Sequence, residues 1–369
     1  MLNGSSFGRR LVITTFGESH GPGLGVVLDG LPPGLAVDLG AVQAELDRRR
    51  PGQSAVTTAR REPDRVEVLS GLVDGRTGGT PLALLVRNQD ADGAAYQDLA
   101  DVFRPGHADY PYAAKYGLRE ARGGGRSSGR ETVARVAAGA VARQILAAWG
   151  VTIRAWVSRV GAVAGTRVDP AFIEQNPVRA ADPGAAAAME AAILEARAAG
   201  DSVGGQVEIA AEGVPAGLGE PVFGKLDAAL AGALMSIGGV KAVEIGDGCA
   251  LAGLRGSEAN DALDEGGFRS NHAGGILGGI STGQPLRVRI TVKPTASIAR
   301  PQATVDVDGR PRTIAVAGRH DPCLCPRIVP VAEAMVALAL LDAWLLQRSL
   351  GTEGWPAPPP WTGRGPEER

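Results

Sequence analysis

The hexapeptide GLPPGL at residues 30–35 has an echo, GVPAGL, at residues 213–218, and a helix-forming stretch follows each copy. The shared pattern Gly-x-Pro-x-Gly-Leu is typical of a turn, because proline fixes its own φ and glycine accepts left-handed backbone. A turn that leads into an amphipathic helix twice in one chain indicates two similar halves. The fold class expected from this echo is α+β, with two related halves.

The residues after the first turn predict a helix that Asp38 caps and Pro51 ends. Its apolar residues recur on one face: Leu39, Val42 and Leu46. Arg49 continues that spacing, so its side chain is expected to point inward. Its neighbours Arg48 and Arg50 have a simpler alternative role, which is to complement the negative C-terminal end of the helix.

A second helix is expected after the glycine-rich loop GGGRSS at residues 123–128. Ser128 and Glu131 match the S-x-x-E capping box, and an apolar face follows them: Val133, Val136, Ala140 and Val141. The free N–H groups and the dipole at a helix N-terminus suit a phosphate, and Arg126 and Arg130 add positive charge there. An ordinary capped loop is the alternative interpretation, because this pattern has low specificity.

Alternating apolar and polar residues predict strands at residues 66–71, 81–86, 205–211, 240–246 and 285–293. A hairpin is expected about Asp308 and Gly309, and the alanine-rich residues 184–199 predict a helix. The most apolar segment, residues 328–346, carries a proline and two acidic residues, so we expect a buried helix rather than a membrane span.

No linker-like segment interrupts the first 350 residues, so a single domain is expected over residues 1–350. Residues 351–369 are rich in proline, glycine and charge, and are expected to be a disordered tail. The N-terminus shows no signal-peptide pattern. Three cysteines, an odd number in a long chain, argue against a disulfide scaffold and favour a reducing, cytoplasmic location.

The net charge and the aromatic content both argue against nucleic acid as the partner. The net charge of −2 gives no global basic field for nucleic acid, and 4% aromatic residues offer few stacking platforms. A nucleic-acid binder that uses RRR and GGGRSSGR is therefore the weaker hypothesis. His320 lies near the two cysteines of DPCLCP, but the chain lacks the ligand spacing of a zinc site, so no metal is expected.

The polar loops suggest a site for a small anion. All four histidines (His20, His107, His272 and His320) occur in glycine-rich or polar stretches, and five arginines lie in or beside such loops: Arg49, Arg104, Arg126, Arg130 and Arg319. Arginine binds phosphate and carboxylate through two hydrogen bonds, and histidine can exchange a proton near neutral pH. There is no Walker A motif and no nucleophile elbow, and no G-x-G-x-x-G follows a strand.

Three long segments closely resemble the chorismate synthase family, at residues 14–34, 101–140 and 269–298, and the short segment GRHDPC at residues 318–323 follows them. The resemblance extends from about residue 7 to residue 347, with the motifs in the family's order. It implies an anti 1,4-elimination of phosphate from 5-enolpyruvylshikimate-3-phosphate to give chorismate, in the shikimate pathway. It also implies a requirement for reduced FMN without net redox change, a homotetramer, and a β-α-β sandwich of two antiparallel sheets that enclose a helical layer.

The same resemblance assigns roles to residues. His107 would protonate or hydrogen-bond the reduced flavin, His20 would assist the departing phosphate, and Asp321 would accept a proton near the flavin, helped by Ser19 and Ser128. The implied flavin contacts are Arg126, Ser127, Ser128, Gly238, Gly239, Gly278, Lys293, Pro294, Thr295, Ala296, Ser297 and Arg319. The implied substrate contacts are Arg49, Arg104 and Arg130.

The sequence departs from the family's pattern at three places. Ala55 stands where the family usually has an arginine, which removes one expected anion contact. The stretch MSIGG replaces MSINA or MSIPA, which should matter less because backbone makes the contact there. Ala296 replaces a serine in KPTSS, so it can offer only backbone. The chain has no added flavin reductase segment, so NADPH would act only as an indirect source of reducing equivalents. A flavin oxidoreductase that reduces its own FMN is the rival enzyme class.

Overall fold

Two antiparallel sheets frame the chain, which the computed structural model describes over residues 4–54, 56–58, 62–89, 100–120, 123–316 and 320–350. The expectations for Ala55, Arg319 and residues 351–369 lie outside the described residues. The first sheet has the strand order β1-β2-β3-β7-β4, with these bounds: β1 Ser6–Phe7, β2 Val12–Gly17, β3 Gly23–Asp29, β4 Val66–Ser70 and β7 Leu82–Arg87. Two short strands, β5 Leu72–Val73 and β6 Arg76–Thr77, form a hairpin beside it.

The second sheet has the order β11-β16-β10-β8-β9. Its strands are β8 Thr152–Val160, β9 Val163–Ala164, β10 Gly205–Glu212, β11 Val240–Ile245 and β16 Leu286–Val292. Along β16, buried apolar side chains alternate with more exposed polar ones, as the sequence predicts. The strands expected at residues 66–71, 81–86, 205–211, 240–246 and 285–293 are all confirmed.

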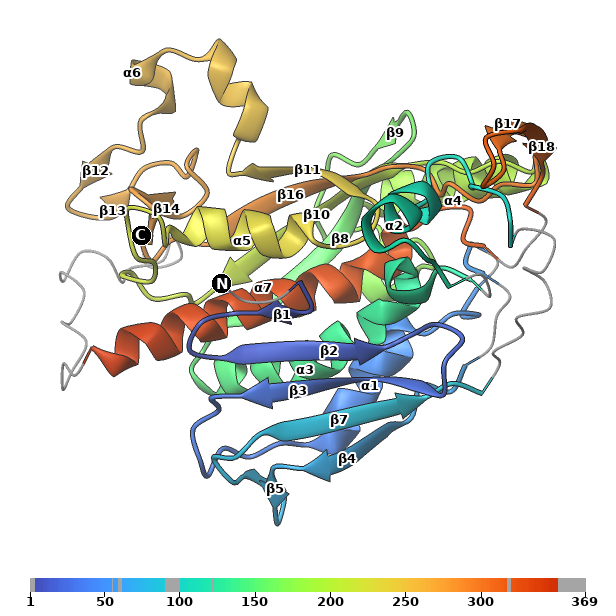
Figure 1. Cartoon of the computed structure of the whole chain (residues 1–369). Coiled ribbons are helices and arrows are strands. Elements are labelled where there is room, and N and C mark those ends of the chain that lie inside the picture. The colour runs from blue at the N-terminus through green and yellow to red at the C-terminus, as the bar shows by residue number, and fades with distance from the viewer. Residues whose placement is uncertain are drawn as a thin grey trace.

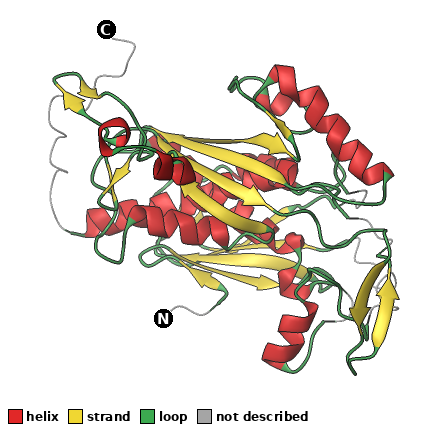
Figure 2. Ribbon diagram, turned by 90° about the horizontal axis from the view of Figure 1, so that it is seen from above, coloured by secondary structure: helices red, strands yellow, loops and turns green. Residues whose placement is uncertain are grey.

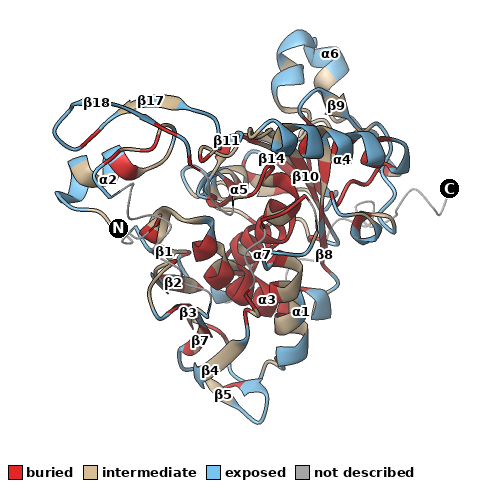
Figure 3. Cartoon of the chain, turned by 90° about the vertical axis from the view of Figure 1, so that its right-hand side faces the viewer, coloured by how far each residue is buried: buried red, intermediate tan, exposed pale blue. Residues whose placement is uncertain are grey.

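Four helices lie between the sheets: α1 Leu39–Arg49, α3 Thr132–Ala148, α5 Leu226–Met235 and α7 Cys325–Ser349. Helices α1 and α3 pack on the first sheet, α5 and α7 pack on the second, and α3 crosses α7 at the centre. Figures 1 and 2 show this helical layer between the two sheets, and Figure 3 shows that α3 and α7 are mostly buried. The expected β-α-β sandwich of class α+β is confirmed.

The two halves share one topology. In the first half the chain forms β2, β3, α1, β4, β7 and then α3; in the second it forms β8, β10, α5, β11, β16 and then α7. In each half the fourth strand in chain order, β7 or β16, lies between the second strand (β3 or β10) and the third strand (β4 or β11). The turn at residues 30–35 lies between β3 and α1, and its echo at residues 213–218 lies between β10 and α5. The echo therefore marks equivalent positions in two related halves.

The remaining elements lie around this sandwich. The longer helices among them are α2 Asp109–Tyr116 and α4 Pro183–Ala198, and α4 packs against β8 and β9. The other short elements are α6 Gly256–Ala259, the 3-10 turns Gly125–Ser127, Gly129–Glu131, Ile173–Gln175 and Gly248–Gly253, and the hairpins β12–β13 (Leu263–Asp264, Gly267–Phe268), β14–β15 (Ile276–Leu277, Ile280–Ser281) and β17–β18 (Gln302–Val305, Pro311–Ile314). The expected hairpin about Asp308 is β17–β18. Figure 1 shows α2 and β17–β18 at one end of the sandwich and β12–β14 at the other.

Helix α1 follows its sequence pattern closely. The Asp38 side chain accepts a hydrogen bond from the Gly40 N–H, which caps the first turn. Val42, Leu46 and Arg49 are buried, whereas Leu39 remains 38% exposed, contrary to the expected apolar face. Leu39 is the first residue of the helix.

Helix α7 is the one described helix that is long and apolar enough to cross a membrane, by length and composition alone. In the fold, 89% of its most apolar 18-residue window is buried. The expectation of a buried core helix is therefore confirmed.

Candidate active site

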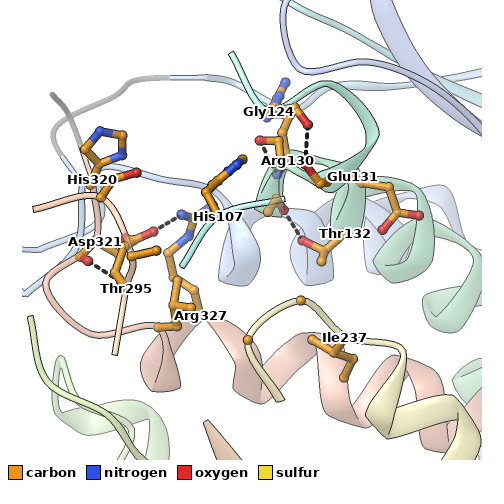
Figure 4. Close-up of a pocket in the computed structure, with 18 of the residues that line it drawn as sticks. His107, Gly124, Arg130, Glu131, Thr132, Ile237, Thr295, His320, Asp321 and Arg327 are labelled. Carbon is orange, nitrogen blue, oxygen red and sulfur yellow. Dashed lines mark hydrogen bonds and ion pairs between the residues drawn. The ribbon is translucent and has the colours of Figure 1, made fainter. Parts of the chain in front are cut away.

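A cavity of about 1320 Å³ opens at the end of the sandwich where α2 and β17–β18 lie. Its walls come from both halves, because residues 104–132 face residues 293–297 and 320–331 across it. Figure 4 shows Gly124, Arg130, Glu131 and Thr132 on one side, with Thr295, His320 and Asp321 on the other. Eight lysines or arginines line the described wall, against two carboxylates and three histidines. The cavity therefore suits a molecule with several negative charges.

One wall carries His107 beside an ion pair between Arg104 and Asp109. The Asp109 carboxylate lies 2.9 Å from His107 Nδ1, and it accepts hydrogen bonds from Arg104 Nε at 2.7 Å and from a terminal nitrogen of Arg104 at 2.8 Å. Arg119 adds a second guanidinium at 3.1 Å. Burial would raise the pKa of Asp109, but its hydrogen bonds and charge interactions with Arg104 and His107 outweigh burial and hold that pKa far below its usual range.

His20 lies near this wall, with its ring over the glycine-rich loop. Ser19 Oγ and His20 Nδ1 are 3.0 Å apart, which is hydrogen-bond distance. A Cβ atom at Gly123, where φ is +154°, would approach the His20 ring within 2.5 Å, so glycine is needed for the two segments to meet. Ser19 itself is buried behind His20 and does not line the cavity.

Two of the expected substrate arginines share one carboxylate. Arg49, which the helix pattern points inward, is only 1% exposed and donates to Asp64 Oδ2 at 2.8 Å. Arg130 pairs with Asp64 Oδ1 at short range and lies 3.6 Å from Glu62. Burial lowers the pKa of Arg49 to about 9, although Asp64 opposes the shift. The pKa of Asp64 is lowered because the two guanidinium groups outweigh the effect of its own burial.

Asp321 ties the two halves together at the opposite wall. Its Oδ1 accepts a hydrogen bond from the Thr58 N–H at 2.9 Å, and its Oδ2 pairs with Arg327 at 2.5 Å. Thr295 Oγ1 donates to the Asp321 carbonyl at 2.7 Å (Figure 4). The carboxylate is only 8% exposed, so it is oriented before any ligand arrives.

Several polar atoms of the described cavity wall lack a hydrogen-bond partner. Within the described residues, Arg49 Nε, one terminal nitrogen of Arg130 and His320 Nε2 are buried without one. Burial, followed by the charge of Arg104, lowers the pKa of His320 to about 4, so its imidazole is neutral near pH 7. Buried polar groups usually have a partner, so these three atoms are the ones that a bound anion or polar ring would satisfy.

The glycine-rich loop reaches the cavity, but the prediction of a capping box between Ser128 and Glu131 is wrong. Ser128 Oγ accepts from the Arg130 N–H, whereas the Glu131 carboxylate accepts from Thr15 Oγ1 and from Arg135 Nε. A 3-10 turn over Gly129–Glu131 delays the start of α3 to Thr132, so Glu131 cannot return to the Ser128 N–H.

The side chain of Arg126, in the same loop, is held by hydrogen bonds within the protein. Its guanidinium donates to the carbonyls of Gly17 and Thr15 and to Thr15 Oγ1, at distances of 2.6 to 3.2 Å. Arg126 thereby fastens the loop to β2.

The structure brings most of the predicted residues to the cavity. These are His20, Arg49, Arg104, His107, Arg126, Ser127, Ser128, Arg130, Gly238, Gly239, Lys293, Pro294, Thr295, Ala296, Ser297 and Asp321. Gly278 does not line it, because it lies in the turn between β14 and β15, where the neighbouring Gly279 packs on Lys225. His272 also lies elsewhere and pairs with Asp247 at 2.6 Å. Arg319 lies outside the described residues.

Sequence reasoning missed three charged cavity residues: Arg135, Lys241 and Arg327. It also missed Asp64 and Asp109, the carboxylates behind the arginines. Asp109 follows His107 by two residues, and that spacing was the one sequence signal for a contact between their side chains. No group of three metal-ligating side chains occurs in the part of the chain that the structure describes.

Comparisons with known proteins all indicate one family. The family model of chorismate synthase matches residues 11–345. A chorismate synthase of Methanocella arvoryzae is 58% identical over 353 residues, covering 92% of this chain and 94% of that protein. One from Nitratidesulfovibrio vulgaris is 55% identical, covering 95% of this chain and 100% of its own length. A crystal structure of chorismate synthase superposes with a TM-score of 0.73 at 31% identity, covering 93% of each chain. The chain belongs to the chorismate synthase family, whose members are lyases.

Proposed function

We propose that the chain converts 5-enolpyruvylshikimate-3-phosphate to chorismate and phosphate by an anti 1,4-elimination. The observation that carries this proposal, beside family membership, is the excess of arginine and lysine in a cavity that also holds three histidines. The substrate has one phosphate and two carboxylates, and each can accept two hydrogen bonds from a guanidinium. Arg49, Arg104 and Arg130 are the proposed contacts for these anions.

The reaction breaks the carbon–oxygen bond to the phosphate and one carbon–hydrogen bond of the ring. The phosphate leaves with the electron pair of its bond, and His20 would donate a hydrogen bond or a proton to it. Asp321 is the proposed acceptor of the ring proton, with Ser19 and Ser128 in supporting roles. The short contact between Asp321 and Arg327 means that the carboxylate must exchange part of this ion pair when it takes up the proton.

The cavity residues fit reduced FMN as the cofactor. Its polar ring needs hydrogen-bond partners, and His320 Nε2 is buried in the cavity wall without one. A Cβ atom at Gly238 would meet no protein atom within 4 Å, so backbone there is open to close approach. The residues that would hold the cofactor are Arg126 to Ser128, Gly238, Gly239, and Lys293 to Ser297. When bound, reduced FMN supplies an electron-rich ring that assists phosphate loss and stays reduced overall, and His107 would hydrogen-bond it.

Three further features belong to the same proposal. We infer a homotetramer, because the family resemblance implies one. We also infer a location in the cytoplasm, with which the free cysteines agree. NADPH would supply reducing equivalents only through another enzyme.

The direct test is formation of chorismate from the phosphorylated substrate under anaerobic conditions with photoreduced FMN. We expect turnover with the reduced flavin, little or none with oxidised FMN, and release of one phosphate per chorismate. His20→Ala and His107→Ala should each lose about 10²–10⁴-fold in kcat, because a side chain positioned for proton transfer contributes that much. The matched control is His272→Ala, which changes the one histidine outside the cavity and should keep the wild-type rate.

Absence of chorismate with reduced flavin would overturn the proposal. Bleaching of bound FMN by NADPH alone would favour the rival flavin oxidoreductase instead.

A further inference from the structure

Asp109 is the best-connected carboxylate near the cavity, although it does not line the wall. It is the first residue of α2, it is 4% exposed, and it receives hydrogen bonds or ion pairs from Arg104, His107 and Arg119. We propose that Asp109 is a positioning residue for the reaction: it fixes His107 in the tautomer with a protonated Nδ1 and leaves Nε2 for the bound molecule. The proposal rests on the proposed function, because it assumes that His107 acts in turnover.

The proton on Nδ1 follows from counting donors around it. Nδ1 lies 2.9 Å from Asp109 Oδ1 and 3.1 Å from a terminal nitrogen of Arg104. That terminal nitrogen has two hydrogens, which have acceptors in Asp109 Oδ1 at 2.8 Å and the Gly123 carbonyl at 3.2 Å. Since an ionised carboxylate can only accept, a short contact between Nδ1 and Oδ1 requires the proton on Nδ1. The neutral ring then keeps its lone pair on Nε2.

The carboxylate is held too firmly to follow a moving imidazole. Its Oδ2 accepts from the Arg104 N–H at 3.0 Å and from Arg104 Nε at 2.7 Å, while Arg119 lies 3.1 Å away. These partners keep the carboxylate ionised, since the pKa of Asp109 is far below its usual range. A fixed, ionised acceptor orients the ring and stabilises the imidazolium that forms when Nε2 takes up a proton, as a buried aspartate does in a catalytic triad.

An asparagine at position 109 would reverse this arrangement. Three donors converge on Oδ2, so the amide oxygen would take that place and the NH₂ group would take the place of Oδ1. The NH₂ group would then donate to His107 Nδ1, which forces the ring proton onto Nε2. Arg104 would lose a charged partner at the same time, so its guanidinium would become freer to bind an anion.

Steady-state kinetics distinguishes the effect of the changed tautomer from the effect of the freed Arg104. Loss of the correct tautomer reduces kcat, whereas release of Arg104 leaves KM for the phosphorylated substrate unchanged or lower. A purely structural aspartate would instead raise KM or lower the amount of folded protein. The matched control is Asp182→Asn, which changes a buried, hydrogen-bonded aspartate that caps α4 and does not line the cavity.

The experiment compares wild type, Asp109→Asn, His107→Ala and the double variant in the anaerobic chorismate assay. We expect Asp109→Asn to lose about 10²-fold or more in kcat with no rise in KM. In the His107→Ala background the same change should cost nothing further, because residues that act through one another are not additive. Asp182→Asn should keep the wild-type kcat. If Asp109→Asn does not fold, Asp109→Glu, which keeps the charge but shifts it, takes its place in the same cycle.

The tautomer of His107 can also be measured by spectroscopy, which does not depend on turnover. Imidazole ¹⁵N shifts of histidine-labelled protein should show His107 with a protonated Nδ1 in wild type and a protonated Nε2 in Asp109→Asn. With four histidines in the chain, the His107 signal is the one absent from His107→Ala.

Additive losses in kcat, a KM effect alone, or a wild-type His107 with its proton on Nε2 would each overturn the proposal. A wild type that makes no chorismate but shows the expected tautomer would refute the proposed function and leave the assigned geometry in place.

Discussion

His320 shows how burial sets the charge of a single residue. Its pKa is lowered to about 4 by burial and by the charge of Arg104, while the unfolded chain titrates near ~6.5. Between these values the unfolded state binds a proton that the folded state does not, so the free energy of unfolding falls as the pH drops from about 6.5 to about 4. His320→Gln should remove this loss, which is on the order of 1–3 kcal/mol. Urea unfolding of both proteins at pH 7 and pH 5 measures it.

His272 provides a control of opposite sign. Its hydrogen bond to Asp247 raises its pKa, so its contribution to stability is present at low pH and is lost as the pH rises through that value. His272→Gln should therefore make the protein slightly more sensitive to acid. An equal acid response in wild type and His320→Gln would contradict the assignment of a buried neutral imidazole.

At the scale of elements, the crossing of α3 and α7 depends on Gly139. A Cβ atom built there would lie 2.3 Å from the Ala334 Cβ and 2.5 Å from its Cα, so one helix would have to move. Gly139→Ala gains about 1 kcal/mol of helix propensity, but overpacking costs about 1–3 kcal/mol and should prevail. Gly232→Ala in α5 meets no atom within 4 Å and should stabilise the protein. Thermal midpoints of the two variants should move in opposite directions, and a stabilised Gly139→Ala would show that the helices can separate freely.

Glu333 joins three elements from the middle of α7. It is 2% exposed and accepts from Arg48 at 2.6 Å, Arg143 at 2.9 Å and the Ala155 N–H at 2.9 Å, which links α7 to α1, α3 and β8. Arg48 therefore does more than complement a helix end. Glu333→Ala leaves two partly buried guanidinium groups without this partner and should cost about 3–5 kcal/mol in the free energy of unfolding.

Glu212→Ala is the matched control for Glu333→Ala. Its partner Arg154 lies 3.4 Å away on the exposed face of the second sheet, so the loss should stay below about 1 kcal/mol. Equal losses in the two variants would mean that the buried network adds no stability of its own.

At the scale of the whole molecule, the cavity lies where the two related halves meet. The segments between β7 and α3 and between β16 and α7 occupy equivalent places in the two halves, and both supply its walls. The resulting charge is uneven: eight lysines or arginines line the described wall, against five carboxylates even when Glu62, Asp64 and Asp109 behind it are included.

This charge predicts a salt effect on substrate binding. KM for the phosphorylated substrate should rise several-fold between about 50 mM and about 500 mM KCl, because salt screens attraction between charges. The kcat should change much less, since the groups at the reacting bonds are buried and already ordered. Initial rates at several KCl concentrations measure both constants, and a KM that does not respond to salt would show that the paired arginines have no net attraction for the substrate.

Local sequence patterns determined the elements, and the family resemblance indicated most of the residues that line the cavity. A helix or strand depends on neighbours within about four residues, so the spacing around Arg49 was enough to place its side chain inside. The turn echo identified the two halves for the same reason. The motifs of the family then indicated which loops would meet, and the loops that carry His20, His107 and Asp321 do line one cavity.

Only the tertiary structure decided what those residues contact. Asp321 meets Thr58, more than 260 positions earlier in the chain, and no local pattern encodes such a distance. Ser128 and Glu131 satisfied a local capping rule, yet Glu131 binds Thr15 and Arg135 instead because β2 and α3 converge there. Charge pairing and burial are properties of the assembled core: they set the proton on His107, the neutral ring of His320 and the partners of each arginine, and they exist only once both halves have packed together.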